Sequence, residues 1–317
     1  MYPSPPAAVL PHNGRMRDRV ALVLALGLAG GAPGSQGVDR DLRLERFTSA
    51  TFGNTRTLRI LVPPGYDAPA NRDRRYPVLY LNDGQNLFDA ATSTFTGREW
   101  RVDETVRELT AAGRIPPLIV VGIDHAGPRG RFREYFPWVD TFLSPPEPDP
   151  QGARYPAFLV DDVIPFVEAR YRVARDPEQR GIGGSSAGGL AAINAVVSRP
   201  GVFGRLLVES PSIYVDDAHI LKNATGVTTW PSRIFLGAGT AEGPPRTCDP
   251  ADGVEPEVVA DLRRFAALLR SAGVADARVR LTVTPCATHD EAAWARRLPD
   301  ALAFLYAHPL GRRQPRR

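Results

Sequence analysis

Short apolar segments and amphipathic segments alternate along this chain from about residue 77 to its C-terminal end. The apolar segments, such as YPVLYLNDG and PPLIVVGID, have the length and the flanking turn residues of buried strands. The amphipathic segments place apolar residues on one helical face, as Val102, Val106 and Leu109 do. Strands that alternate with helices form a mostly parallel sheet with helices on both faces. The sequence therefore predicts an α/β fold of this kind.

The same patterns predict the order of the elements. Before the alternation begins, residues 42–52 and 55–66 indicate two antiparallel strands. Further strands are expected at 76–84, 116–124, 180–186, 203–210, 232–240 and 277–285, and helices at 100–113, 156–171, 187–198, 256–273 and 290–308. Residues 125–152 show no periodicity, so we expect a long loop there. Because no linker or internal repeat interrupts the pattern, one domain is expected at about residues 42–308.

The two ends of the chain lie outside this pattern. Arg17 and Arg19 precede an apolar run of 13 residues that ends in small residues, which is the layout of a secretory signal starting at Met16. The run is too short for a stable membrane span. We therefore expect residues 1–41 to be a signal peptide with its lead, and the protein to be secreted or periplasmic; a cytoplasmic protein with a chance apolar run is the alternative. Residues 309–317 are expected to be a solvated basic tail.

Charge and cysteine content narrow the possible functions. The net charge of +4 is small for 317 residues, and no basic stripe is interleaved with aromatic residues, so nucleic acid is not an expected partner. Cys248 and Cys286 are the only cysteines, and they lack the spacing of a metal or redox motif. Export would permit a disulfide between them, and two free buried thiols are the alternative.

A glycine-lined corner is the first motif that carries chemistry. Gly184-Ser185-Ser186-Ala187-Gly188 fits G-x-S-x-G, between an expected strand and an expected helix. In such a strand-turn-helix elbow the small residues allow strand and helix to approach closely. The helix then directs its free N–H groups at any anion that forms near the serine. The pattern predicts Ser186 as a nucleophile, whereas a purely structural tight turn is the alternative.

A serine hydroxyl needs a base, and the order of groups in this kind of fold is serine, acid, histidine. His289 follows the last expected strand and precedes the last helix, which is where the base is expected. His219 and His308 also follow Ser186, and we expect them at the surface. A capping role for His289 at the start of the helix is the alternative.

The acid is expected after the preceding strand. Glu242 follows that strand directly, and Asp249 or Asp252 in the same loop could replace it. The acid would hold the imidazole in the required tautomer and stabilise the imidazolium.

An oxyanion hole needs two backbone donors. One is expected at the N–H of Ala187, directly after the nucleophile. The other is expected at the N–H of Gln85, because the bend at Gly84 would turn it toward Ser186. This chemistry needs no metal and no organic cofactor.

Taken together and in order, several segments resemble one family. They include YPVLYLNDGQNLFD, GIGGSSAGGLAAINAVVSRPGVFGRLLVESPS and THDEAAWARRLPDALAFLY, and the resemblance covers about residues 42–307. The chain resembles the "putative esterase" family of α/β-hydrolases, which includes enterochelin-type esterases, feruloyl and acetylxylan esterase modules, S-formylglutathione hydrolases and mycolyltransferases.

The resemblance implies the same triad, with Ser186 as nucleophile, His289 as base and Glu242 as acid, and the same donor at Gln85. Some enterochelin-type relatives work without the acid. The segment REYFPW often lines the approach to the active site in similar chains, so it implies Arg133, Glu134 and Trp138 as wall residues. A structural ion pair and a core aromatic residue are the alternative for these three.

We therefore expect a serine esterase that acts through an acyl-enzyme on a small-molecule or carbohydrate-linked ester. Two alternatives keep the same fold. One is an acyltransferase, in which an alcohol replaces water, and the other is a non-catalytic binding protein.

Overall fold

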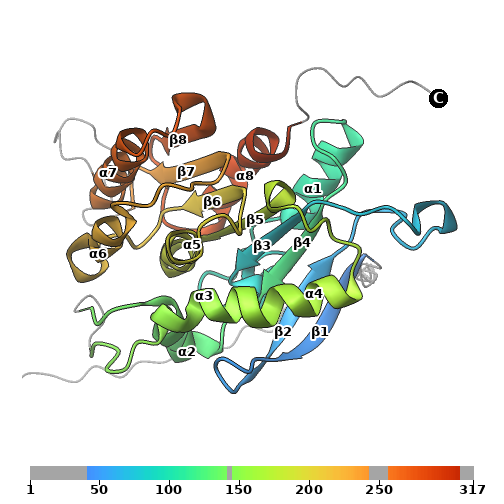
Figure 1. Ribbon diagram of the computed structural model, residues 1–317, viewed down its shortest axis with the longest axis horizontal. Coiled ribbons are helices and arrows are strands. Elements are labelled where there is room, and N and C mark those ends of the chain that lie inside the picture. The colour runs from blue at the N-terminus through green and yellow to red at the C-terminus, as the bar shows by residue number, and fades with distance from the viewer. Residues whose placement is uncertain (1–40, 141–144, 243–255, 308–317) are drawn as a thin grey trace, which may run out of the picture. The chain divides into compact units, whose positions relative to one another are not determined.

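An eight-stranded sheet forms the centre of the computed structural model, which describes residues 41–140, 145–242 and 256–307. The strands lie in the order β1-β2-β4-β3-β5-β6-β7-β8 (Figure 1). Their bounds are β1 Leu42–Thr48, β2 Thr55–Leu61, β3 Val78–Asn82, β4 Ile119–Ile123, β5 Arg180–Ser185, β6 Arg205–Glu209, β7 Arg233–Gly239 and β8 Val279–Thr284. Strand β1 pairs antiparallel with β2, and β2 antiparallel with β4. All the other pairs are parallel, as the alternating pattern predicts.

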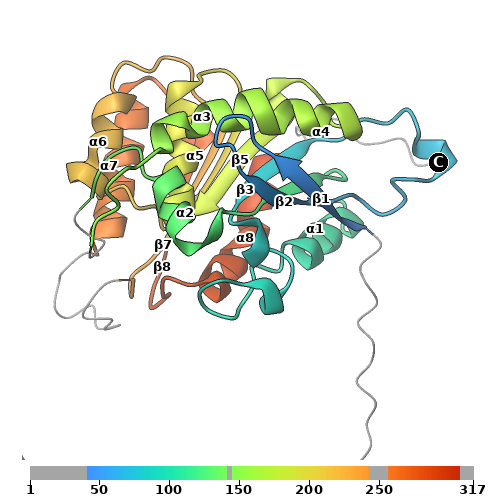
Figure 2. The same ribbon diagram turned by 90° about the horizontal axis from the view of Figure 1, so that it is seen from below.

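Helices cover both faces of the sheet (Figure 2). Their bounds are α1 Val102–Ala111, α2 Gly127–Tyr135, α3 Tyr155–Ala157, α4 Ile164–Arg170, α5 Ser186–Ser198, α6 Val215–Ala224, α7 Glu257–Ser271 and α8 Glu291–Tyr306. Helices α1 and α8 pack on one face, and α2 to α7 lie on the other. The chain thus forms the α/β-hydrolase fold that the sequence predicts.

The central strands are apolar on both faces because both faces are covered. In β3, Val78 and Tyr80 belong to the core beneath α3 to α5, whereas Leu79 and Leu81 belong to the core beneath α1 and α8. Successive side chains of a strand point to opposite faces, so a strand between two helical layers must be apolar at every position. This is why the sequence predicts these strands so clearly.

Two helices, α2 and α6, lie where no helix was expected. Residues 125–152 contain α2, so the prediction of an unbroken loop is wrong there. The α2 sequence GPRGRFREY is poor in helix formers, and its side chains find their partners on distant segments. Helix α6 lies where the sequence shows no helical pattern, and Asp216, Asp217 and Ala218 within it have left-handed backbone angles.

The expected helix at 156–171 contains a turn of π-helix, Phe158–Val163, between α3 and α4. The described residues belong to one compact unit. The expected domain boundaries, the signal peptide and the basic tail stay predictions, because residues 1–40 and 308–317 lie outside the described residues. In the described part of the chain, no helix combines the length and apolar character needed to cross a membrane.

Candidate active site

Ser186 occupies a sharp corner between β5 and α5. Its φ of 55° lies in the left-handed region, which non-glycine residues rarely adopt. A Cβ on Gly184 would lie 2.7 Å from the carbonyl carbon of Gly188, and a Cβ on Gly188 would lie 2.9 Å from Oδ2 of Asp83. Strand, helix and neighbouring turn are therefore packed too closely for any residue larger than glycine at either position.

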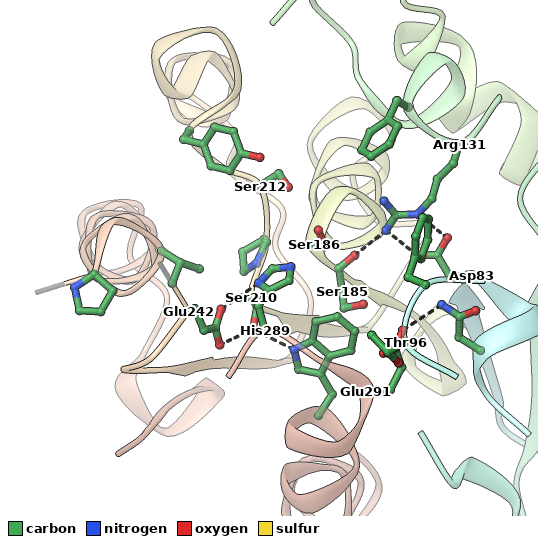
Figure 3. Close-up of a pocket in the computed structure, with 18 of the residues that line it drawn as sticks. Asp83, Thr96, Arg131, Ser185, Ser186, Ser210, Ser212, Glu242, His289 and Glu291 are labelled. Atoms are coloured by element: carbon green, nitrogen blue, oxygen red, sulfur yellow. Dashed lines mark hydrogen bonds and ion pairs between the residues drawn. The ribbon is translucent and has the colours of Figure 1, made fainter. Parts of the chain in front are cut away.

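A pocket of about 480 Å³ lies beside this corner. Its residues come from the carboxyl ends of several parallel strands, because the chain leaves β3, β5, β6, β7 and β8 at the same edge of the sheet. Ser186, Ser210, Glu242 and His289 all line it (Figure 3). The structure thus brings the predicted nucleophile, acid and base into one pocket.

His289 is held by Glu242. The imidazole Nδ1 lies 3.1 Å from Oε2 of Glu242, in hydrogen-bond geometry (Figure 3). The carboxylate side chain is only 1% exposed, whereas the imidazole is 37% exposed and open to the pocket. The two residues meet because the strands before them are neighbours, with Gly239 of β7 opposite Thr284 of β8.

The carboxylate of Glu242 has further donors on its other oxygen. Oε1 accepts a hydrogen bond from the hydroxyl of Ser210 at 2.7 Å and one from the backbone N–H of Gly239. The indole Nε1 of Trp294 donates in turn to the Ser210 hydroxyl at 2.9 Å. These bonds fix the orientation of the carboxylate.

Ser186 is half-buried, and its hydroxyl has no hydrogen-bond partner among the described residues. Hydrogen bonds between a nucleophile and its base are often long before substrate binds. The hydroxyl faces the pocket that His289 also lines.

The two predicted oxyanion donors lie on the elements that follow β3 and β5, which are neighbouring strands. Ala187 is the second residue of α5, so its N–H has no acceptor within the helix. Gln85 lies in the 3₁₀ turn Gly84–Asn86, which follows Asp83 with a φ of 59°. Neither Gln85 nor Ala187 lines the pocket itself, but the adjacent residues Asn86 and Ser186 do.

Arg131 and Asp83 form a buried ion pair at the edge of the pocket. Nε and Nη2 of Arg131 each donate to one oxygen of the carboxylate, both at 2.8 Å. The hydroxyl oxygen of Tyr135 accepts the N–H of Asp83 at 3.2 Å. Helix α2 therefore holds the turn that carries Gln85.

The three residues expected to line the pocket wall do not line it. Arg133 pairs with Asp149, Glu134 pairs with the buried Arg56, and the ring of Trp138 stacks on His219 with centroids 4.4 Å apart. Arg131 and Phe132, which precede the segment REYFPW on α2, line the pocket instead. Arg133 and Glu134 lie on α2, of which only one face reaches the pocket, whereas Trp138 lies beyond the end of α2. For Glu134 the structural ion pair is the interpretation that fits.

Several pocket residues were not anticipated from the sequence. These are Asn86, Phe95, Thr96, Tyr214, Glu291 and Trp294. Glu291 and Trp294 occupy the first turns of α8, directly after His289, and that proximity is the one signal that could have identified them. Phe95 and Thr96 lie on a segment without periodicity, so nothing local marks them.

The remaining sequence-based candidates lie elsewhere or outside the described residues. His219 is partly exposed and bonded to Asp216. Cys286 takes part in a disulfide. Its pairing with Cys248 stays a prediction because Cys248, like Asp249, Asp252 and His308, lies outside the described residues. Within the described ranges, no three His, Cys, Asp or Glu side chains cluster closely enough to hold a metal ion.

The sequence of this chain is similar to those of known proteins. Residues 49–305 match the model of a protein family described as "Putative esterase". Bacillus subtilis YbbA, an uncharacterized protein, is 25% identical over 256 residues, which cover 80% of this chain and 93% of YbbA. The ferri-bacillibactin esterase BesA of Bacillus subtilis is 28% identical over 183 residues. That alignment covers 53% of this chain and 60% of BesA.

Solved structures share the fold. The enterobactin esterase FES from Shigella flexneri superposes with a TM-score of 0.62 at 20% identity, over 85% of this chain and 60% of FES. The BES protein from Bacillus cereus gives a TM-score of 0.64 at 17% identity, over 88% of this chain and 100% of BES.

Proposed function

The chain belongs to this esterase family and is a carboxylic-ester hydrolase, and we propose how it acts. Its catalytic triad consists of Ser186, His289 and Glu242, and its intermediate is an acyl-enzyme. The observation that carries the proposal is the His289–Glu242 hydrogen bond of 3.1 Å, in the pocket that also holds the strained Ser186. A buried acid, an oriented imidazole and a serine on an elbow are the parts that acyl transfer requires.

The tautomer of His289 follows from its partner. Glu242 accepts only, so Nδ1 carries the proton and Nε2 is free to accept the proton of the Ser186 hydroxyl. The serine oxygen attacks the ester carbonyl carbon as this proton moves. The imidazolium then returns the proton to the departing alcohol, which leaves the acyl group on Ser186.

The second half of the reaction repeats the first with water. His289 removes a proton from water, the hydroxide oxygen bonds to the acyl carbon, and the bond to Ser186 breaks as the serine regains a proton. In both halves the negative charge on the carbonyl oxygen would rest on the N–H groups of Gln85 and Ala187. No step requires a metal or an organic cofactor.

The lining of the pocket supports a small-molecule ester with an apolar or aromatic part. Phe95, Phe132, Tyr214 and Trp294 contribute to its walls. Relatives are named as esterases of enterobactin and of ferri-bacillibactin, and one is a xylanase/feruloyl esterase. We therefore propose that the substrate is a small-molecule or carbohydrate-linked ester with an aromatic group in its acyl or alcohol part.

A fluorophosphonate probe tests the triad. It should label the wild-type chain at one site, and peptide mapping should place the phosphonate on Ser186. Ser185→Ala should still react, because Ser185 is buried in β5, whereas Ser186→Ala should not. Label on any other residue, or equal label in Ser186→Ala, would contradict the proposal.

A further inference from the structure

Glu291 is a buried carboxylate that the mechanism above does not use. It is the first residue of α8, two positions after His289, and it lines the pocket while being 1% exposed. Oε1 accepts a hydrogen bond from Nδ2 of Asn86 at 3.1 Å, and Oε2 accepts one from the Thr96 hydroxyl (Figure 3).

In the part of the chain that the structure describes, no cation pairs directly with this carboxylate, because the guanidinium of Arg131, which acts on Glu291 electrostatically, pairs with Asp83 instead. Among the described residues, no Arg, Lys or His forms an ion pair with Glu291, and burial raises the pKa of its carboxyl group. A buried charge without a directly bonded counter-ion costs stability, and an apolar side chain would fill the same space without that cost. The contribution of Glu291 to the structure therefore lies in its hydrogen bonds with Asn86 and Thr96.

Asn86 connects Glu291 to the turn that carries Gln85. The N–H of Asn86 donates to the carbonyl oxygen of Asp83 at 2.9 Å and so closes the turn around Gln85. Oδ1 of Asn86 accepts the N–H of Thr94 at 3.0 Å, and its carbonyl oxygen accepts the N–H of Trp100 at 2.9 Å. The side-chain amide of Asn86 thus donates a hydrogen bond to Glu291 of α8 and accepts one from the backbone of Thr94.

We propose that Glu291 is a positioning residue for the oxyanion hole, which holds the Gly84–Asn86 turn at a fixed distance from the His289 end of α8. This inference rests on the proposed function, because it takes the N–H of Gln85 as an oxyanion donor. The Asn86–Glu291 hydrogen bond joins the Gly84–Asn86 turn to α8, which begins two residues after His289. The Glu291 carboxylate therefore sets the distance between the proposed oxyanion donor and the proposed base.

The kinetic consequence follows from when the oxyanion forms. The carbonyl oxygen gains its charge only in the transition state, so a displaced turn lowers kcat and leaves KM nearly unchanged. Misplacement by about 1 Å costs roughly a hundredfold in rate. A merely structural role would change the melting temperature without this separation of kcat from KM.

Exchanging the amide of Asn86 and the carboxylate of Glu291 tests whether the hydrogen bond between them positions the turn. Asn86→Asp places two carboxylates face to face and should lower kcat for p-nitrophenyl butyrate about 10- to 100-fold, counted per site labelled by the fluorophosphonate. Glu291→Gln can still accept from Asn86 and should lower kcat no more than about threefold. The double variant Asn86→Asp/Glu291→Gln restores the bond with donor and acceptor exchanged, so its kcat should return to within about threefold of wild type.

Inhibition by a trifluoromethyl ketone provides a second readout. The serine oxygen adds to its carbonyl carbon, and the oxyanion of the resulting hemiketal uses the same donors, so the inhibition constant should rise in Asn86→Asp by the factor that kcat loses and recover in the double variant. Asp300→Asn removes a charge from the exposed side of the same helix and serves as the control.

A wild-type kcat in Asn86→Asp would overturn the inference, and so would a double variant no more active than Asn86→Asp. A rise in KM alone would also overturn it. None of these results is confused with failure of the triad, because that failure appears as activity and labelling retained by Ser186→Ala.

Discussion

At the scale of single residues, the site depends on close contacts that leave no space for a methyl group. Gly188 faces Asp83 and Asn82, the residues that precede the oxyanion turn. A Cβ on Gly188 would lie 2.9 Å from Oδ2 of Asp83 and 3.1 Å from Cβ of Asn82. Because Arg131 fixes the Asp83 carboxylate, the turn itself must shift.

We therefore expect Gly188→Ala to lower kcat at least about tenfold, in steady-state assays of a p-nitrophenyl ester. Gly204→Ala is the matched control, since its Cβ would lie 2.6 Å from Cα of Glu178, away from the pocket. The control should lower the melting temperature without a specific loss of kcat per labelled site. Equal loss of kcat in the two variants would contradict the account.

The Ser210 hydroxyl holds the carboxylate of Glu242, the proposed acid. Its hydroxyl joins Trp294 Nε1 to Glu242 Oε1, and its own φ of 46° is left-handed. Ser210→Ala leaves the indole N–H without its acceptor and gives the carboxylate one donor fewer. We expect kcat to fall about tenfold with little change in KM, as measured by steady-state kinetics. If KM alone rises, Ser210 acts on substrate instead of on Glu242.

At the scale of elements, a buried ion pair joins β6 to α8. Nε and Nη2 of Arg297 donate to Oε2 of Glu209 at 2.8 and 2.6 Å. Burial raises the pKa of Glu209 to about 7 in spite of this partner. Between its unfolded pKa, about 4.5, and this folded value, the native protein binds a proton that the unfolded chain releases. The stability from that proton is complete below about pH 4.5 and is lost as the pH rises through about 7.

Glu209→Gln removes this titration. The free energy of unfolding of wild type relative to Glu209→Gln should therefore be larger at pH 5 than at pH 8, and it should change by up to about 1.4 kcal/mol per pH unit between the two pKa values. The difference in melting temperature should follow the same direction. Thermal unfolding at the two pH values measures it. A constant difference, or one that favours wild type more at pH 8, would contradict the assignment.

Whether a helix or strand could be predicted from the sequence depended on where its side chains find their contacts. The strands were predictable because burial on two faces makes them apolar throughout, and α7 because its own side chains form one apolar face. Helix α2 was not predictable, since Arg131, Glu134 and Tyr135 find their partners on segments 48 to 80 residues earlier. Tertiary contacts override a poor local propensity there.

At the scale of the whole molecule, chain topology explains why part of the site could be predicted. Ser186, Glu242 and His289 each follow a parallel strand, and parallel strands end at one edge of the sheet. The order of motifs was therefore enough to bring these residues together. The pocket wall was different, because the face of α2 that reaches the pocket depends on packing. Arg131 and Phe132 line the pocket, whereas Arg133 and Glu134 on α2, and Trp138 beyond its end, do not.

The most direct test of the central claim is the rate of p-nitrophenyl butyrate hydrolysis by wild type and Ser186→Ala, with equal folding shown by the melting temperature. We predict that kcat/KM falls at least about 10³-fold in the variant, because removal of a nucleophile from a triad leaves only the catalysis from binding and the oxyanion hole. Equal rates in the two proteins would contradict the account and assign the hydrolysis to another residue.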